Sequence, residues 1–337
     1  MTGPVHGPVG VPVTVGVPVT VLTGFLGAGK TTLLAALVRR PELARTAVLI
    51  NELGAIAIDH HLVRDVRGDT VVLGSGCVCC AVAGDLVRAL LELAAQAARG
   101  DISPFERALI ETTGLADPAG VVAALVQHPL VARAYRAGAV VTAVDGSLGL
   151  TTLAKQPEAV AQVALADRLV ITKTDLASAA ELEALAAALR VRNAAAAIVH
   201  AAHGVIEPDV LLAPAPDAAW VDAATRGPGV HGFITTFTVC FAEPVRMGPL
   251  GLWLAIMTQM HGPTLLRVKG LVNAVGEAAP VVIDCVQHVI HPARQLPAWP
   301  DDDRRTRLVF IARGLAASTI KSIRTSLAET MGQPLLA

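Results

Sequence analysis

The sequence predicts an α/β protein, with a parallel sheet covered by helices on both faces, followed by a smaller α+β domain. Up to about residue 205, short and continuously apolar strand segments alternate with Ala- and Leu-rich helical segments. Such strands are typical of a parallel sheet that is buried on both faces. A pattern of longer strands follows a stretch rich in Pro, Ala, Asp and Gly. The length of 337 residues also exceeds what one compact core usually organises, so we expect two domains.

The expected organisation has four parts. Residues 1–16, mainly Gly, Pro and Val, form a flexible leader. The sheet domain occupies 17–205, a linker occupies 206–230, and the second domain occupies 231–330.

The hydrophobic pattern places the individual elements. In the first domain we expect strands at 17–22, 47–50, 70–73, 108–110, 139–144, 168–171 and 196–200. Helices are expected at 31–39, 84–98 and 178–191. The second domain should contain strands at 233–241, 265–275, 281–288 and 307–311, a helix at 248–260 and a last helix after the final strand.

Composition excludes several classes of function. A net charge of −1 and 3% aromatic residues argue against a nucleic-acid partner. No stretch long enough to cross a bilayer lacks a charge or a break, and no signal segment opens the chain. Clustered rather than dispersed cysteines favour metal binding or redox chemistry in a reducing compartment, so we expect a soluble cytoplasmic protein.

A glycine-rich loop joins the first strand to the first helix. Residues 24–31 fit G-x-x-x-x-G-K-[ST] in the strand-to-helix context that a phosphate-binding loop requires, which predicts the sheet of a P-loop NTPase. The glycines let backbone N–H groups point at phosphate oxygens, Lys30 is expected to bridge the β- and γ-phosphates, and Thr31 to bind Mg²⁺. A chance glycine-rich turn is the alternative. The residues expected to hold the nucleotide here are Gly24, Gly27, Ala28, Gly29, Lys30, Thr31 and Thr32.

A second element follows the strand at 108–110. Glu111 stands where a parallel strand usually carries the acid that holds Mg²⁺, here through water, and Gly114 can offer a backbone N–H to the γ-phosphate. Glu111 could instead be an ordinary acid at a strand end. Beside the phosphate loop, the functional interpretation is favoured.

The segment 172–175, Thr-Lys-Thr-Asp, follows the strand at 168–171. GTPases commonly carry Asn-Lys-x-Asp there. Asp175 would accept hydrogen bonds from guanine N1–H and the 2-amino group, and Lys173 would lie along the ring. Thr172 stands in place of the Asn, so the side-chain amide of that position is missing here. The alternative is a helix cap formed by Asp175 or Thr174.

Three thiols are packed between a glycine-rich turn and a helix. Cys77, Cys79 and Cys80 near a helix N-terminus would form a soft site for Zn²⁺ or Co²⁺. Three ligands leave a fourth position open, which suits metal transfer. A redox pair or buried thiols are the alternatives.

In combination, these motifs resemble the CobW family of metal-trafficking GTPases, and the likeness runs from about 17 to 327. The segments that carry it are 24–34, 51–54, 76–80 and 111–118, with 266–270, 286–288 and 307–311 in the second half.

The resemblance implies a GTP-driven metallochaperone that uses GTP and Mg²⁺, carries metal at its Cys-x-Cys-Cys motif, and serves a client metalloprotein or metal-cofactor pathway. Zn²⁺ is the first expectation by softness and Co²⁺ the second. The resemblance also implies a mobile switch at 51–59. Leu53, Ala55 and Ala57 depart from the family pattern there, and the missing carboxylate at 55 removes acidic assistance. Whether the protein forms a homo-oligomer is left open by the sequence.

The remaining histidines and cysteines are mostly expected to have structural or surface roles. His60 or His61 could supply the fourth metal ligand but would more often be a surface histidine. Cys240 and Cys285 lie in apolar strands and are expected to be buried core thiols. The histidines expected at the surface, or in structural or partner contacts, are His200, His203, His288 and His291.

Two other classes of function compete with a chaperone. A small-molecule kinase would need a substrate pocket and acid–base residues, and the guanine segment and cysteine cluster argue against it. A metal- or redox-sensing binding protein would use the thiols and keep nucleotide only for structure. Because no residue is identifiable as a strong water-activating base, intrinsic GTP hydrolysis is expected to be slow.

Overall fold

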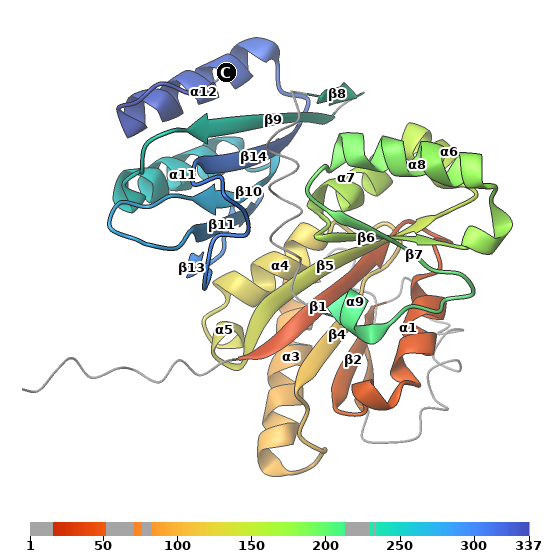
Figure 1. Cartoon of the computed structure of the whole chain (residues 1–337). Helices are drawn as coiled ribbons and strands as arrows, with labels where there is room; N and C mark the ends of the chain where they lie inside the picture. The colour runs from red at the N-terminus through yellow and green to blue at the C-terminus, as the bar shows by residue number, and fades with distance from the viewer. Residues whose placement is uncertain (1–15, 52–70, 76–81, 213–228, 232–233, 337) are drawn as a thin grey trace, which may run out of the picture.

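The computed structural model describes residues 16–51, 71–75, 82–212, 229–231 and 234–336. Over these ranges the chain forms two sheets, each with its own helices (Figure 1). Nearly all of the predicted leader, most of the predicted switch segment and the three clustered cysteines lie outside the described residues.

The first sheet has seven strands, and every neighbouring pair in it is parallel. The strand order is β3-β2-β4-β1-β5-β6-β7, which places β1 between β4 and β5. The strands are β1 (Val17–Gly24), β2 (Thr46–Asn51), β3 (Val71–Ser75), β4 (Arg107–Glu111), β5 (Tyr135–Asp145), β6 (Arg168–Thr172) and β7 (Ala197–His200).

Helices cover both faces of this sheet, which confirms the predicted fold class. Leu33, Leu34 and Leu37 of α1 pack on one face, whereas α3, α4 and α7 pack on the other. The helices and 3₁₀ turns are α1 (Lys30–Val38), η1 (Pro41–Leu43), α3 (Val82–Arg99), α4 (Pro118–Gln127), α5 (Val131–Ala134), α6 (Gly149–Lys155), α7 (Pro157–Leu165), η2 (Thr174–Leu176), α8 (Ala179–Arg192) and α9 (Pro208–Leu212). The stretch expected to be a linker contains the short helix α9. Its Leu212 packs against the core beside α1, which holds this segment to the first domain.

The second sheet is antiparallel and belongs to a smaller α+β domain, as predicted. Its elements are β8 (Gly229–His231), β9 (Ile234–Phe241), α11 (Met247–His261), β10 (Leu265–Val272), β11 (Val281–Val286), β12 (Val289–Ile290), β13 (Arg294–Gln295), β14 (Thr306–Arg313) and α12 (Ala317–Met331). One face of the sheet packs on α11 and α12, with the rings of Phe237 and Phe310 stacked 4.8 Å apart.

Two expectations for this domain need correction. Cys285 is buried as predicted, but Cys240 is only half-buried, because Phe237, Val239 and Phe241 on alternate positions of β9 face the core. The strand predicted at 281–288 ends at Val286, because Gln287 takes a left-handed φ of 50° and starts the turn to β12. His288 therefore lies in a turn.

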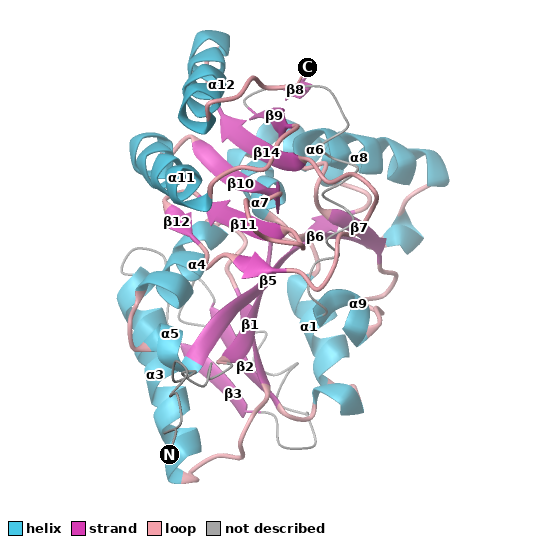
Figure 2. Cartoon of the chain, turned by 60° about the vertical axis from the view of Figure 1, so that its left-hand side comes forward, coloured by secondary structure: helices cyan, strands magenta, loops and turns pink. Residues whose placement is uncertain are grey.

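The other face of the second sheet lies against the first domain. Figure 2 shows α4 and α7 between the two sheets, and an apolar cluster joins residues of these helices to residues of β9, β10, β11, β12 and β14. Among the described residues, no helix is long and apolar enough to span a bilayer.

Candidate nucleotide site

The predicted phosphate loop leaves β1 at the carboxyl end of the sheet and enters α1. Gly27 and Gly29 have φ values of 75° and 85°, in the left-handed region that other residues rarely adopt. Gly29 is the N-cap of α1, so the positive end of the helix dipole faces the loop. Lys30 is buried, and its Nζ donates to the backbone oxygens of Gly24 at 2.9 Å and Phe25 at 3.2 Å. This arrangement gives a phosphate the N–H groups and the ammonium it requires.

Thr31, in the first turn of α1, meets Glu111 at the end of β4. Leu22 of β1 pairs with Glu111 of β4, and the Thr31 hydroxyl donates to Glu111 Oε1 at 2.7 Å. A hydroxyl and a carboxylate beside a phosphate loop are hard oxygen donors of the kind that Mg²⁺ prefers, so this pair fits a magnesium site.

Gly114 lies against the phosphate loop itself. A Cβ on Gly114 would come within 2.6 Å of Leu26 N, so the close approach of the two backbones requires glycine here. The loop that contains Gly114 is held by Gln162 of α7, whose Nε2 donates to the backbone oxygens of Gly114 and Ala116, both at 3.1 Å. Sequence analysis missed Gln162, although a lone polar side chain among the apolar residues of a helix is a visible signal.

Thr172 connects the guanine segment to the phosphate loop. Its hydroxyl donates to the backbone oxygens of Ala28 at 2.8 Å and Val144 at 3.2 Å. Thr172 thus lacks the amide of an asparagine but still links the two loops through a buried hydrogen bond.

Lys173 is oriented by an acid that sequence analysis missed. Its Nζ lies 2.6 Å from Asp145 Oδ2. Burial alone would raise the pKa of Asp145, but hydrogen bonds from Lys173 and from the N–H groups of Leu148 and Ser147 lower it below its ordinary value. Asp145 directly follows a buried apolar strand, the same signal that marked Glu111.

Asp175 lies beside the loop that follows β7. The backbone N–H of His203 donates to Asp175 Oδ1 at 3.4 Å, and His203 Nδ1 is 3.5 Å from Asp175 Oδ2. His203, expected only as a surface residue, is exposed but flanks the predicted guanine carboxylate.

The predicted transition-metal site cannot be compared with the described structure. Cys77, Cys79 and Cys80, together with His60 and His61, lie outside the described residues. Within the part of the chain that is described, no group of three His, Cys, Asp or Glu side chains could hold a metal ion.

Comparisons with known proteins extend over nearly the whole chain. Residues 18–200 match the family described as CobW/HypB/UreG, nucleotide-binding domain, and residues 234–328 match the cobalamin synthesis protein cobW C-terminal domain. The zinc chaperone YjiA of Escherichia coli is 30% identical over 312 residues, which cover 91% of this chain and 97% of that protein. The zinc chaperone CobW of Pseudomonas aeruginosa is 30% identical over 352 residues, covering 92% of each. The crystal structure of Zn(II)-bound YjiA GTPase from E. coli is similar with a TM-score of 0.70 at 26% identity, covering 93% of this chain and 99% of that one.

Proposed function

Because the chain belongs to the CobW family and is a P-loop GTPase, we propose that it is a metallochaperone that binds Zn²⁺ at Cys77, Cys79 and Cys80 and delivers it to a client metalloprotein. The observation that carries the proposal is the contact of Thr31 with Glu111 beside the phosphate loop, in a chain that aligns over nine-tenths of its length with two zinc chaperones. Co²⁺ is the alternative cargo.

The geometry of the phosphate loop and its neighbours supports the nucleotide roles in this proposal. Lys30 would neutralise charge on the β- and γ-phosphates, and Thr31 and Glu111 would hold Mg²⁺, which would supply positive charge where negative charge develops. The backbone N–H of Gly114 is assigned to the γ-phosphate, and the close approach of its loop to the phosphate loop supports this role.

Guanine recognition is assigned to the segment after β6. Asp175 accepts the two guanine donors, and Lys173, held by Asp145, lies along the ring. A carboxylate that must pair with these donors discriminates against adenine, which lacks them.

The metal step is proposed to depend on nucleotide. A ligand can shift a two-state protein only by its differential affinity for the two states, and a full conversion from held to released metal requires about 5.5 kcal/mol. The γ-phosphate contacts at Gly114 and in the expected switch supply that difference. Hydrolysis then converts the tight-binding state to the releasing state.

The first test is zinc affinity, measured by competition with a chromophoric chelator in the presence of GTPγS–Mg²⁺, GDP–Mg²⁺ or no nucleotide. We expect at least about a tenfold difference between the GTPγS and GDP states, a 1.4 kcal/mol effect. Cys79→Ser should abolish high-affinity binding, whereas Cys240→Ser, at a half-buried thiol of the second domain, should leave it intact.

Equal zinc affinity in all three states would contradict the proposed coupling. The chain would then be better described as a metal- or redox-binding GTPase whose nucleotide serves structure. Zinc affinity that survives Cys79→Ser would instead contradict the assignment of the metal site.

A further inference from the structure

A buried glutamine joins helix α7 to the loop that follows β4. Gln162 is 0% exposed, and its Nε2 is shared between the backbone oxygens of Gly114 and Ala116. Its own backbone oxygen accepts a hydrogen bond from the Thr142 hydroxyl at 2.9 Å. The helix is therefore fixed to β5 at the residue that holds the loop.

The amide of Gln162 is costly for the core. Its Oε1 is buried and has no hydrogen-bond partner among the described residues, and an unpaired buried oxygen destabilises a fold. An apolar side chain would pack here without that cost. The contribution specific to glutamine is thus its pair of hydrogen bonds to the loop of residues 111–117.

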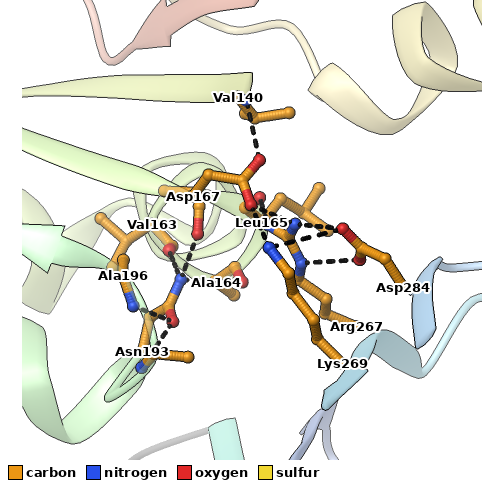
Figure 3. Close-up of polar contacts among 12 residues, drawn as sticks. Val140, Val163, Ala164, Leu165, Asp167, Asn193, Ala196, Arg267, Lys269 and Asp284 are labelled. Atoms are coloured by element: carbon orange, nitrogen blue, oxygen red, sulfur yellow. Dashed lines mark hydrogen bonds and ion pairs between the residues drawn. The ribbon is translucent and has the colours of Figure 1, made fainter. Parts of the chain in front are cut away.

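The C-terminal end of α7, just beyond Gln162, is attached to the second domain. Arg267 of β10 donates to the backbone oxygen of Leu165, the last residue of α7. Asp167 Oδ1 lies 2.6 Å from Arg267 Nη2 and 2.7 Å from Lys269 Nζ (Figure 3). Asp284 of β11 completes the cluster at 3.0 Å from Arg267. Arg267, Lys269 and Asp167 are all buried, so this attachment is shielded from solvent.

A second connection starts at the end of the same loop. Asp117 caps α4 by accepting from the N–H of Ala119 at 2.9 Å, and its other oxygen accepts from Gln287 Nε2 of the second domain at 3.0 Å. Helix α4 in turn packs against β12. The loop is consequently held at Gly114 and Ala116 by a residue of α7, a helix that contacts the second domain, and at Asp117 by a residue of the second domain.

We propose that α7 and Asp117 couple the loop of residues 111–117 to the C-terminal domain, with Gln162 as a positioning residue for GTP hydrolysis. This inference rests on the proposed contact of that loop with the γ-phosphate. A loop that moves on γ-phosphate binding must move Gln162 or break its hydrogen bonds. The observed hydrogen bonds hold Gly114 against the phosphate loop, where its contact with the γ-phosphate is proposed. The docked second domain therefore favours the triphosphate-binding position of the loop, and by linkage the triphosphate strengthens the docking.

The test of Gln162 uses the full-length chain and two fluorescent nucleotides, mant-GppNHp and mant-GDP, each with Mg²⁺. Gln162→Met keeps the shape and removes the donor. We expect the Kd for mant-GppNHp to rise about tenfold and kcat for GTP to fall by a similar factor, because the buried carbonyl of Gly114 and the partly buried carbonyl of Ala116 lose their donor. The Kd for mant-GDP should stay within about twofold. Leu189→Ala, on the buried face of α8, is the control for plain destabilisation and should not change the ratio of the two Kd values.

The test of the domain coupling uses a matched pair of glutamines. Gln287→Ala should reduce the triphosphate preference about threefold to fivefold, since its bond is exposed. Gln295→Ala removes a similar exposed bond to Glu277 within the second domain and should have no effect. Lys269→Met, which leaves Arg267 on Asp167, should act in the same direction as Gln287→Ala.

Three outcomes overturn the inference at different points. An unchanged Kd ratio in Gln162→Met refutes the positioning role. A normal ratio in both Gln287→Ala and Lys269→Met, with the expected loss in Gln162→Met, refutes the coupling to the second domain. Gly114→Ala separates the inference from its premise: if this variant still prefers mant-GppNHp, the loop does not sense the γ-phosphate, and the site assignment fails with the inference.

Discussion

Thr172 illustrates how one side chain can replace another with different chemistry. In the sequence it only lacks the amide expected at its position. In the structure its hydroxyl reaches the backbone of Ala28 and of Val144, 144 and 28 residues away in the chain. The side chain is buried, so these hydrogen bonds are protected from water and hold the guanine segment against the phosphate loop.

Thr172→Val should therefore weaken the binding of GTP and GDP equally, by about tenfold, because the isosteric change leaves the Ala28 oxygen buried and unpaired. Isothermal titration calorimetry with both nucleotides would measure it. Thr172→Asn, which restores an amide, should keep most of the affinity. Thr258→Val is the matched control, since Thr258 is equally buried but donates within α11. Unchanged affinity in Thr172→Val would mean that the tether has no role in binding.

The functional side chains that could be identified from the sequence are those that belong to a local sequence motif. Lys30 and Glu111 follow from a loop motif and from a strand that ends in an acid. Asp145 and Gln162 stand out locally, as an acid after an apolar strand and a polar residue in an apolar helix, but their partners and the role of His203 could not be assigned, because these depend on which loops the strand order brings together. Gln162 acts on residues 46 and 48 positions earlier in the chain, a separation that no local pattern encodes.

Helix α8 begins with a capping box next to the guanine segment. Ser178 Oγ accepts from the N–H of Glu181, and the Glu181 carboxylate accepts from the N–H of Ser178, which together form a capping box. The helix is anchored by buried Leu185 and Leu189. Because the box begins three residues after Asp175, it also fixes the end of the guanine segment.

Ser178→Ala should lower the free energy of unfolding by roughly 1 kcal/mol through loss of the cap. The hydrogen bonds from Ser178 lower the pKa of Glu181 in the folded protein. The stability that they contribute is therefore fully present above pH 4.5, the ordinary pKa, and is lost as pH falls through the lowered pKa of the folded state. Urea unfolding at pH 7 and at pH 3.5 should show a smaller difference from wild type in acid. Ser322→Ala, in the middle of α12, should be neutral or stabilising. Equal effects of the two changes would refute a special role for the box.

The individual elements could largely be predicted, but their assembly could not. Strands and helices of both domains lie close to their expected ranges, because apolar periodicity reflects burial. No range was predicted for the helices α4 to α7 between the central strands. The short elements β8, β12, β13 and α9 were not predicted either, since two to five residues carry too little periodicity. The docking of the two domains could not be predicted from the sequence, because residues that join them, such as Asp167 and Arg267, are 100 residues apart in the chain.

The domain interface combines an apolar cluster with a buried set of balanced charges. Asp167 and Asp284 face Arg267 and Lys269, so the cluster has no net charge. Burial alone would raise the pKa of Asp167, but the two bases lower it well below its ordinary value of 3.8. Removing one member of such a cluster leaves an uncompensated buried charge, which costs far more than losing an exposed pair.

Asp167→Asn should lower the free energy of unfolding at pH 7 by about 3–5 kcal/mol, because Arg267 and Lys269 then share Asp284 alone. The wild-type carboxylate contributes stability above pH 3.8, and this contribution is lost as pH falls through its lowered folded pKa, so the difference should shrink in acid. Denaturant unfolding at pH 7, 5, 4 and 3 would follow both trends. Asp101→Asn is the control: its ion pair with Arg99 is exposed on both sides, so about 1 kcal/mol or less is expected. Similar losses for the two variants at pH 7 would show that the apolar contacts alone hold the domains together.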